Sequence, residues 1–329
     1  MLIRHPPGWK LPETATTPEA AFRQRRDLLG NIAAGSAWLA TTSALASWDI
    51  VTARAESEPP DPNANLYPAP RNLRYDPERA VMAERYDITF GNFYEFGPEK
   101  NISVPSQALK THPWTVTIGG LVERAVAYDA DELIRRMPLE ERIYRHRCVE
   151  GWAMTLPWTG FPLAKLIDLA RPLSSARYVR FTSFGSEALP LSISLPKGYA
   201  WPYVEALTIA EATNELAFIA TGLYGKPITK QNGAPLRVVV PWKYAFKDIK
   251  SIIRIDFVDR QPRTFWPTIN PNAYGFWGNV NPNVSHPRWS QATELLRGTN
   301  ERVSTQIFNG YENYVGYLYS RLQDENLYR

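Results

Sequence analysis

Proline is the residue that most restricts how this chain can fold. The chain of 329 residues contains 28 prolines, spread along its length, which is well above average usage. Because proline lacks a backbone N–H, it interrupts helix interiors and central strands. The sequence therefore predicts short strands, long ordered connections and few helices. A hydrophobic content of 44% is enough for a substantial core, and the absence of heptads or repeats argues against coiled coils and solenoids.

Hydrophobic patterning indicates where the regular elements lie. Alternation and β-branched runs predict strands over residues 114–118 (ended by a turn at Gly119-Gly120), 143–149, 178–181, 189–195, 236–241 and 251–258. Helical spacing predicts helices over residues 128–136 (with Asp129 as N-cap), 162–169 and 311–322.

Residues 47–329 are expected to form a single domain of the α+β class, rich in β-structure. No compositional break occurs within residues 56–329, and domain boundaries usually coincide with such breaks. Residues 56–110, rich in Pro and Asn, are predicted to form an extended N-terminal arm on the domain surface. The net charge is +4, and part of the excess lies in the first 30 residues. The remainder is nearly balanced and gives no case for nucleic-acid binding.

Residues 1–46 are typical of an export signal. Arg25-Arg26 precedes an uncharged, weakly apolar stretch that ends in the small-x-small sequence Ala44-Leu45-Ala46, which is the usual order of regions in a secretory signal. The arginine pair with two following leucines is similar to a twin-arginine signal, although Gln24 and Leu28 stand where Ser or Thr and Phe are usual.

Export by this route would place the protein in the periplasm, folded and carrying a cofactor inserted beforehand. Signal cleavage is expected after Ala46, or as late as Ala55. The alternative is a membrane anchor, which polar residues such as Asn31 and Thr41 disfavour.

Cys148 is the only cysteine, so it cannot form an internal disulfide. Exported chains usually pair their cysteines, and an unpaired one needs another explanation. Arg145, His146 and Arg147 precede it, and nearby positive charge favours the thiolate that binds metals. The alternative is an inert, buried thiol that packs as a small hydrophobic group.

Other chemical signatures are weak or absent. The sequence has no GxGxxG, HExxH or GxSxG motif. A zinc site built from His112, His146, His286 and Cys148 is conceivable but has no supporting spacing. The sequence contains a second basic run, made of Arg237, Lys243, Lys247 and Lys250. These side chains could hold a phosphate with the help of backbone amides. The alternative is that these residues form a basic face exposed to solvent.

Nine stretches of the sequence together resemble a known family, in the family's own order and spread over nearly all of residues 86–315. They are residues 92–97, 138–150, 160–163, 199–205, 231–237, 240–246, 250–252, 281–282 and 286–294. The family is that of the molybdenum-containing catalytic subunits of periplasmic protein-methionine-sulfoxide reductases, within the sulfite oxidase fold. The resemblance implies a molybdopterin-binding domain of the sulfite oxidase type, without the C-terminal immunoglobulin-like dimerisation domain.

The resemblance also implies a cofactor and the residues that hold it. The cofactor would be molybdenum-molybdopterin in its mononucleotide-free form, with Cys148 as metal ligand and catalytic residue. The implied cofactor-binding residues are Asn92, Tyr94, Glu95, Ser183, Asn232, Arg237, Asp248, Ile249 and Lys250. Two departures stand out: Gly91 replaces the first of two consecutive Asn, so that contact is expected to be lost, and Ser183 stands where the family has Thr.

The implied reaction is oxygen-atom transfer from methionine sulfoxide in periplasmic proteins, which repairs them. The resemblance also implies that electrons come from a membrane-bound haem b subunit linked to quinol, and nothing in this sequence binds haem itself. The expected partners are therefore this subunit, oxidised periplasmic proteins and the twin-arginine translocase. Two alternatives remain open: a periplasmic sulfite dehydrogenase-like oxidoreductase, which commonly carries a further dimerisation or haem domain, and a non-catalytic periplasmic binding protein.

Overall fold

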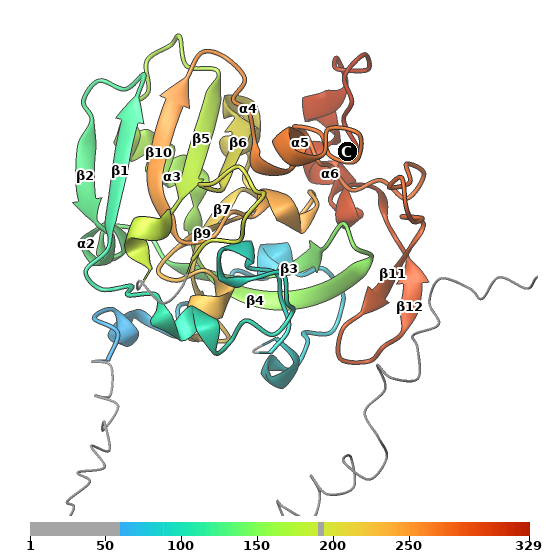
Figure 1. The fold of residues 1–329 in the computed structure, drawn as a ribbon, viewed down its shortest axis with the longest axis horizontal. Coiled ribbons are helices and arrows are strands. Elements are labelled where there is room, and N and C mark those ends of the chain that lie inside the picture. The colour runs from blue at the N-terminus through green and yellow to red at the C-terminus, as the bar shows by residue number, and fades with distance from the viewer. Residues whose placement is uncertain (1–59, 88, 190–193) are drawn as a thin grey trace, which may run out of the picture. The chain divides into compact units, whose positions relative to one another are not determined.

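Two β-sheets form the framework of this protein in a computed structural model, which describes residues 60–87, 89–189 and 194–329. The predicted signal and both cleavage positions lie outside the described residues. The first sheet has the order β2 (Val126–Asp129), β1 (Thr115–Gly120), β10 (Ile252–Val258), β5 (Tyr178–Ser183) and β6 (Val204–Thr208). Strands β1 and β10 run parallel and the other neighbours antiparallel (Figure 1).

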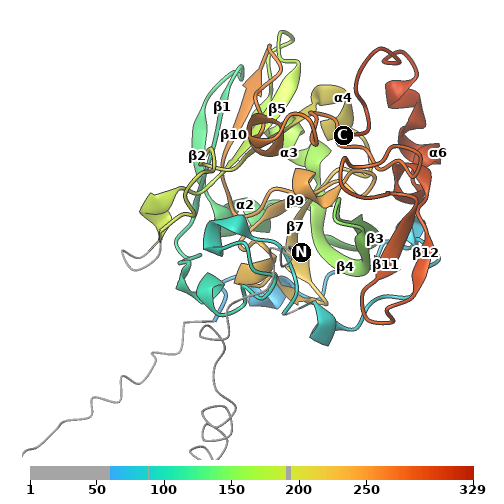
Figure 2. The same cartoon turned by 45° about the vertical axis from the view of Figure 1, so that its right-hand side comes forward.

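The second sheet holds the hairpin that carries the cysteine. Its order is β12 (Arg302–Ser304), β11 (Thr293–Leu296), β4 (Trp152–Pro162), β7 (Phe218–Leu223) and β8 (Lys226–Pro227), with β3 (Glu140–Arg147) paired to β4 and β9 (Arg237–Val239) paired to β7. Strand β11 pairs in parallel with β4, which brings the C-terminal part of the chain beside the hairpin (Figure 2). Apolar side chains of both sheets share one core.

Within the described residues the helices are short, as the proline content predicts. They are α2 (Ala130–Arg135), α3 (Leu163–Ala170), α4 (Ile209–Ala212), α5 (Phe265–Ile269) and α6 (Glu312–Val315). The side chain of Asp129 accepts a hydrogen bond from the backbone N–H of Glu132 at 3.0 Å, so Asp129 is the predicted N-cap of α2. Among the described residues, no helix has the length and apolar character that crossing a membrane requires.

Most of the expected elements are present, with informative differences at their ends. The predicted turn at Gly119-Gly120 is wrong, because both glycines belong to β1. Gly120 has φ +75°, and a Cβ there would lie 2.3 Å from the carbonyl oxygen of Phe257, so the parallel neighbour requires glycine. The strand predicted over residues 143–149 is β3, which runs from Glu140 to Arg147. Cys148 therefore lies in the turn that follows the strand.

Three further segments differ from the sequence pattern. The tail expected as one helix over 311–322 is divided into α6 and a 3₁₀ turn at Gly316–Tyr319. The strand expected over 189–195 lies largely outside the described residues, which omit 190–193. Strand β4 was not predicted, because ten of its eleven residues are buried and a strand buried on both faces shows no alternation.

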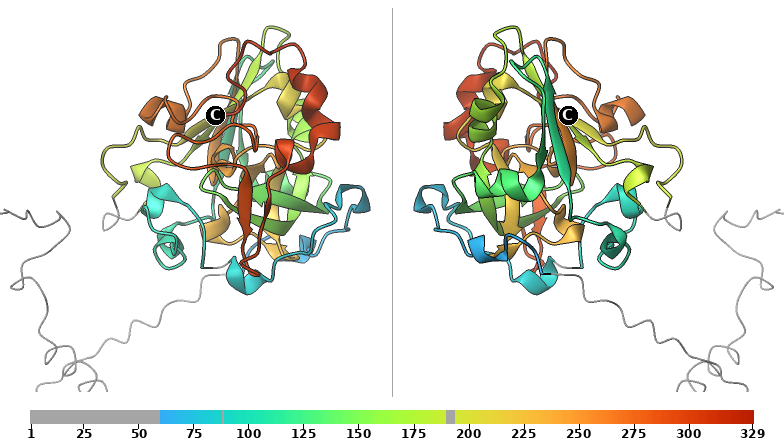
Figure 3. Two further views of the ribbon diagram at one scale, coloured as in Figure 1. Left: turned by 90° about the vertical axis from the view of Figure 1, so that its right-hand side faces the viewer. Right: turned by 90° about the vertical axis from the view of Figure 1, so that its left-hand side faces the viewer.

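The segment from residue 60 to 110 runs as an extended arm with short 3₁₀ turns and no strand longer than an isolated bridge. It is held to the hairpin by backbone hydrogen bonds, from Asn72 N–H to Glu141 C=O at 2.8 Å and from Met82 N–H to Thr155 C=O at 2.9 Å. Figure 3 shows the start of this segment in blue beside the green strands of the hairpin. The arm thereby brings Asp87 and residues 90–95 to the pocket that contains Cys148.

Candidate functional site

A pocket of about 900 Å³, counting the open space at its mouth, lies where the arm, the β3–β4 turn and the loops around β9 meet. Nine of the ten residues that the sequence singles out line it: Asn92, Tyr94, Glu95, Cys148, Asn232, Arg237, Asp248, Ile249 and Lys250. The structure therefore brings together residues that are up to 158 positions apart, as in the hydrogen bond from the Lys250 ammonium to the Asn92 carbonyl.

Cys148 occupies the first position of the turn between β3 and β4. Its backbone N–H donates to the carbonyl of Trp152 at 2.9 Å, and the N–H of Gly151 donates to the Cys148 carbonyl at 3.1 Å. Gly151 has φ +90°, a conformation that other residues adopt at a cost. Cys148 is 5% exposed, and its sulfur accepts a hydrogen bond from the backbone N–H of Glu150 at 3.5 Å. The turn thus presents the thiol at the pocket wall.

The basic neighbours do not make the thiolate the favoured form of Cys148, although Arg147 acts in the expected direction and lowers the pKa. Burial raises the pKa of Cys148 to about 12, and the Glu150 carboxylate adds to this effect. Arg147 is buried against Glu294, with Nε 3.0 Å from Oε2, and Arg145 donates to the Pro77 carbonyl at 2.8 Å. Because side chains alternate along a strand, both arginines lie on the face away from the pocket.

His146, between them, does line the pocket. Its Nδ1 lies 3.2 Å from Oδ2 of Asp248, and burial lowers its pKa despite that partner. A neutral imidazole supplies no charge to the neighbouring thiol. Lys100 in the arm lowers the pKa of Cys148, and Arg147 does so to a smaller extent, but burial outweighs both.

Lys100 and Glu150 form an ion pair beside the cysteine that sequence reasoning missed. Lys100 Nζ lies 2.5 Å from Oε2 of Glu150, and the indole N–H of Trp152 donates to the same oxygen at 3.0 Å. Burial alone would raise the pKa of Glu150, but these hydrogen bonds lower it overall, so a charged carboxylate stands beside the thiol. No local pattern could have revealed a pair formed across 50 positions.

Two cations stand together deeper in the pocket. Arg237 is 3% exposed and donates to the carbonyls of Asn232 and Asp248, each at 3.0 Å. Burial lowers the pKa of Lys250 to about 7, and repulsion from Arg237 contributes. Within the described part of the chain, no carboxylate lies at ion-pair distance from Lys250. This arrangement favours an anionic ligand, because an anion would stabilise both charges.

Lys243 and Lys247 do not belong to this cation pair, so their expected role in holding a phosphate is wrong. Lys243 is paired with Glu211 and Lys247 with Glu205, each pair at 2.5 Å and almost completely buried. Their sequence spacing resembles that of a basic face, but both side chains are only 1% exposed, Lys243 in a β-bridge with Asn279 and Lys247 at the end of the 3₁₀ turn over Ala245–Lys247.

Ser183 is the one predicted site residue that does not line the pocket. Its side chain is completely buried at the end of β5. Its hydroxyl has no hydrogen-bond partner among the described residues, yet it is close enough to lower the pKa of Glu95, which burial raises. Ser183 therefore lies behind Glu95 rather than at the pocket wall.

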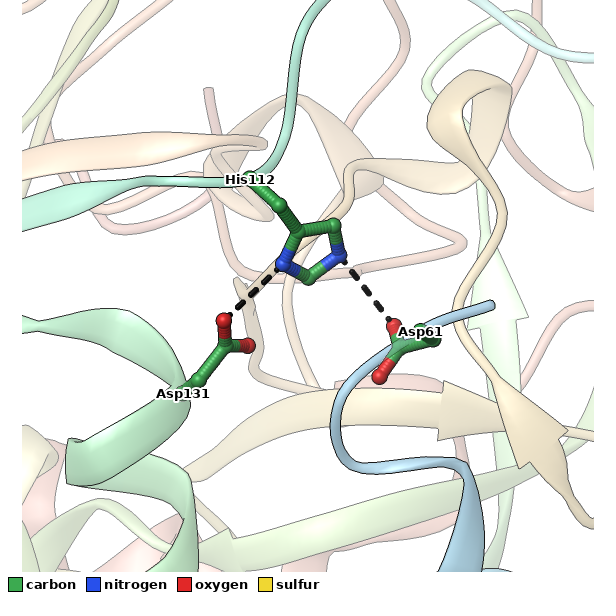
Figure 4. A group of neighbouring side chains, drawn as sticks. All are labelled: Asp61, His112 and Asp131. Atoms are coloured by element: carbon green, nitrogen blue, oxygen red, sulfur yellow. Dashed lines mark hydrogen bonds and ion pairs between the residues drawn. The ribbon is translucent and has the colours of Figure 1, made fainter. Parts of the chain in front are cut away.

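The histidines do not assemble into the zinc site considered from the sequence. Within the described residues, the potential ligand group found is Asp61, His112 and Asp131, and it does not include Cys148. Figure 4 shows His112 between the two carboxylates, with Nδ1 3.0 Å from Asp131 and Nε2 3.4 Å from Asp61. Both ring nitrogens already have protein partners, which accounts for the cluster as a tether between the arm and α2.

Comparison with known proteins decides the family. Residues 101–266 match the oxidoreductase molybdopterin binding domain. The chain is 44% identical to the protein-methionine-sulfoxide reductase catalytic subunit MsrP of Burkholderia mallei, over 95% of this chain and 94% of the relative. It is 45% identical to the MsrP of Xanthomonas axonopodis pv. citri, over 94% of this chain and 95% of the relative. The chain belongs to this family.

Membership confirms the resemblance seen in the sequence, together with the molybdopterin-binding oxidoreductase class and the β-rich α+β fold. Among solved structures, the sulfane dehydrogenase SoxCD from Paracoccus pantotrophus aligns with 68% of this chain and 57% of its own, at 15% identity and a TM-score of 0.40.

The pocket residues fit the molybdenum cofactor of the family. The thiol is a soft ligand of the kind that thiophilic metals select, and a coordinating metal deprotonates a thiol outright, whatever its pKa in the free chain. The cation pair of Arg237 and Lys250 suits the terminal phosphate of a pterin.

Proposed function

We propose that this chain is the catalytic subunit of a molybdenum-dependent reductase that converts methionine sulfoxide in proteins to methionine. The observation that carries the proposal is the position of the only cysteine in the pocket that also holds the cation pair, in a chain that is 44% identical to MsrP along nearly its whole length. The overall change is balanced by two electrons and two protons, which turn the sulfoxide into a thioether and water.

The bound cofactor supplies the oxygen-atom transfer itself. Cys148 holds the metal as a thiolate. Arg237, Lys250 and Asn232, with the backbone of residues 248–250, bind the pterin and its phosphate. We extend the proposal to the form without an attached nucleotide, since one pair of cations matches one phosphate.

The protein environment prepares this ligand arrangement before the metal arrives. The thiol is preorganised by the hairpin turn and by the Glu150 N–H, at 3.5 Å from the sulfur. The amide of Asn92 lies 3.9 Å from the same sulfur, so the arm and the hairpin both contact the metal ligand. Displacement of the arm is therefore expected to loosen the site.

The cellular setting is part of the proposal. Residues 1–46, with the Arg25-Arg26 pair, support export to the periplasm by the twin-arginine route. Oxidised periplasmic proteins are the proposed substrates. A membrane-bound haem b subunit that draws on quinol is the proposed electron donor, by analogy with the family.

The first experiment compares the purified protein with its Cys148→Ser variant. We expect about one molybdenum per wild-type chain, and reduction of methionine sulfoxide by a reduced dye. The variant is expected to fold, to lose the metal and to lose turnover. Sulfite, offered with an oxidised dye, is the control substrate. Faster turnover of sulfite than of methionine sulfoxide would contradict the proposal, as would a folded wild-type protein with full metal and no sulfoxide reduction.

A further inference from the structure

Three aromatic rings form one wall of the pocket that contains Cys148. They belong to Tyr94, Trp266 and Tyr274, which come from the arm, from α5 and from the turn after α5. The indole lies between the two phenols, with centroids 4.9 Å from Tyr94 and 5.0 Å from Tyr274. Phe246 packs edge-on against Tyr274 at 5.3 Å, which supports the wall from behind.

The wall connects the accessible side of the pocket with the thiol. Tyr94 and Trp266 are half-buried, whereas Tyr274 is 8% exposed and Cys148 5%. Tyr274 and Cys148 line the same pocket, and a phenol hydroxyl carries its proton at neutral pH.

The two phenol hydroxyls of the wall differ from other buried phenols in this protein. Tyr67, Tyr203 and Tyr224 each donate to a backbone carbonyl, at 2.8, 2.7 and 2.8 Å. Across the described ranges, neither Tyr94 nor Tyr274 has a hydrogen-bond partner for its hydroxyl. Neither hydroxyl is among the fully buried side-chain atoms that lack a partner, so both are accessible from the pocket and can donate a hydrogen bond to a bound ligand.

The side chain of methionine sulfoxide has the complementary chemistry. Its methyl and methylene groups are apolar, and its sulfur can contact aromatic rings favourably. Its S–O group is a strong hydrogen-bond acceptor that requires a donor when it leaves water. Aromatic faces with one protonated hydroxyl near the metal ligand match both halves of this group.

We propose that the wall of Tyr94, Trp266 and Tyr274 is the binding site for the sulfoxide side chain, and that the Tyr274 hydroxyl donates a hydrogen bond to the sulfoxide oxygen. Trp266 contacts the methyl and methylene groups. This inference rests on the proposed function. Tyr94 corresponds to an implied cofactor contact, so the hydrogen bond to substrate is assigned to Tyr274.

The test uses the molybdenum-loaded protein and three variants. Tyr274→Phe removes only the hydroxyl, and Trp266→Leu removes the aromatic face. Tyr199→Phe is the matched control, because Tyr199 belongs to the same aromatic cluster, 6.2 Å from Trp266, but does not line the pocket. Molybdenum content is measured for each, then steady-state kinetics with methionine sulfoxide and with dimethyl sulfoxide.

We expect Tyr274→Phe to lower kcat/KM by roughly 10- to 100-fold for both substrates, because both present the same S–O acceptor. Trp266→Leu should raise KM for methionine sulfoxide more than for dimethyl sulfoxide, and Tyr199→Phe should match the wild type. Calorimetry with the oxidised protein, which does not turn over, should show methionine sulfoxide binding to Tyr274→Phe about tenfold more weakly, with methionine binding unchanged.

Two outcomes would overturn the inference. One is a fully loaded Tyr274→Phe variant with kcat/KM within about twofold of the wild type. The other is a loss of molybdenum from that variant, which would assign the hydroxyl to the cofactor. If the wild type binds methionine sulfoxide through Tyr274 but does not reduce it, the proposed function fails while the binding site stands.

Discussion

The sulfur of Cys148 lies 3.8 Å from a carboxylate oxygen of Glu150, its neighbour in the hairpin turn. A negative charge at this distance disfavours the thiolate, and burial acts in the same direction. The chain without metal therefore holds a protonated thiol, and the metal must displace that proton when it binds. This relationship leads to the first prediction.

In metal-free protein, Glu150→Gln should lower the pKa of Cys148 from about 12, because the nearest negative charge is removed while Lys100 keeps its positive charge. The measurement is the rate of thiol alkylation as a function of pH, which should rise at a lower pH than in the wild type. Glu132→Gln, at an exposed ion pair on α2, is the control. An unchanged alkylation profile in Glu150→Gln would contradict the electrostatic account.

Gly151→Ala should destabilise the hairpin by about 1–2 kcal/mol, because a Cβ is disfavoured at φ +90°. The matched control is Gly91→Ala, since neither glycine has an atom within 4 Å of an added Cβ and only Gly151 has a positive φ. Chemical denaturation of both variants gives the free energies of unfolding. Equal effects at the two positions would show that backbone strain is not the cause.

Lys247→Met should cost roughly 3–5 kcal/mol, because it leaves the buried Glu205 without its partner. Lys165→Met removes an exposed pair with Asp168 and should change stability by less than about 1 kcal/mol. The double variant Lys247→Met with Glu205→Gln should recover part of the loss. If the folded Lys247→Met protein were as stable as the wild type but lacked molybdenum, Lys247 would be a cofactor ligand after all.

Asp87→Asn tests a buried carboxyl at the pocket wall. Burial raises the pKa of Asp87 from 3.8 to about 6, although its Oδ2 accepts the Asn232 amide. Because the pKa of Asp87 is higher in the folded protein than in the unfolded chain, binding of the carboxyl proton stabilises the folded state. This contribution is complete below the pKa of the unfolded chain and is lost as the pH rises through about 6. In metal-free protein, Asp87→Asn should therefore gain stability relative to the wild type between pH 4 and pH 8, by about 3 kcal/mol.

The control for this prediction is Asp76→Asn, whose carboxylate is half-exposed. It removes one partner of an exposed ion pair with Arg71, so its effect on stability should be less than about 1 kcal/mol. The measurement is denaturant unfolding of each pair of proteins at several pH values. A loss of stability in Asp87→Asn that is the same at low and high pH would mean that the carboxylate is charged and well paired.

Much of the pocket could be predicted because the family resemblance depends on local strings of residues. The strings around Asn92, Cys148, Asn232 and Lys250 each supply residues that line the pocket. Strand β4 was missed because its burial on both faces removes the alternation that identifies a strand. The role of Lys243 was misjudged because its partner, Glu211, lies 32 positions earlier, and charge spacing alone does not distinguish an ion pair from a phosphate site.

By itself, the sequence determined the family, the β-rich α+β fold with short helices, and Cys148 as the candidate metal ligand. These depend on residue identity and order, which a linear chain records. The tertiary structure alone decided that the thiol is protonated in the free chain, that Lys250 and Arg237 face the pocket while Lys243 and Lys247 do not, and that Trp266 and Tyr274 line the pocket that contains the thiol. Burial and partners from distant segments control these properties, and the free energy of an ionised or polar group depends on exactly those surroundings.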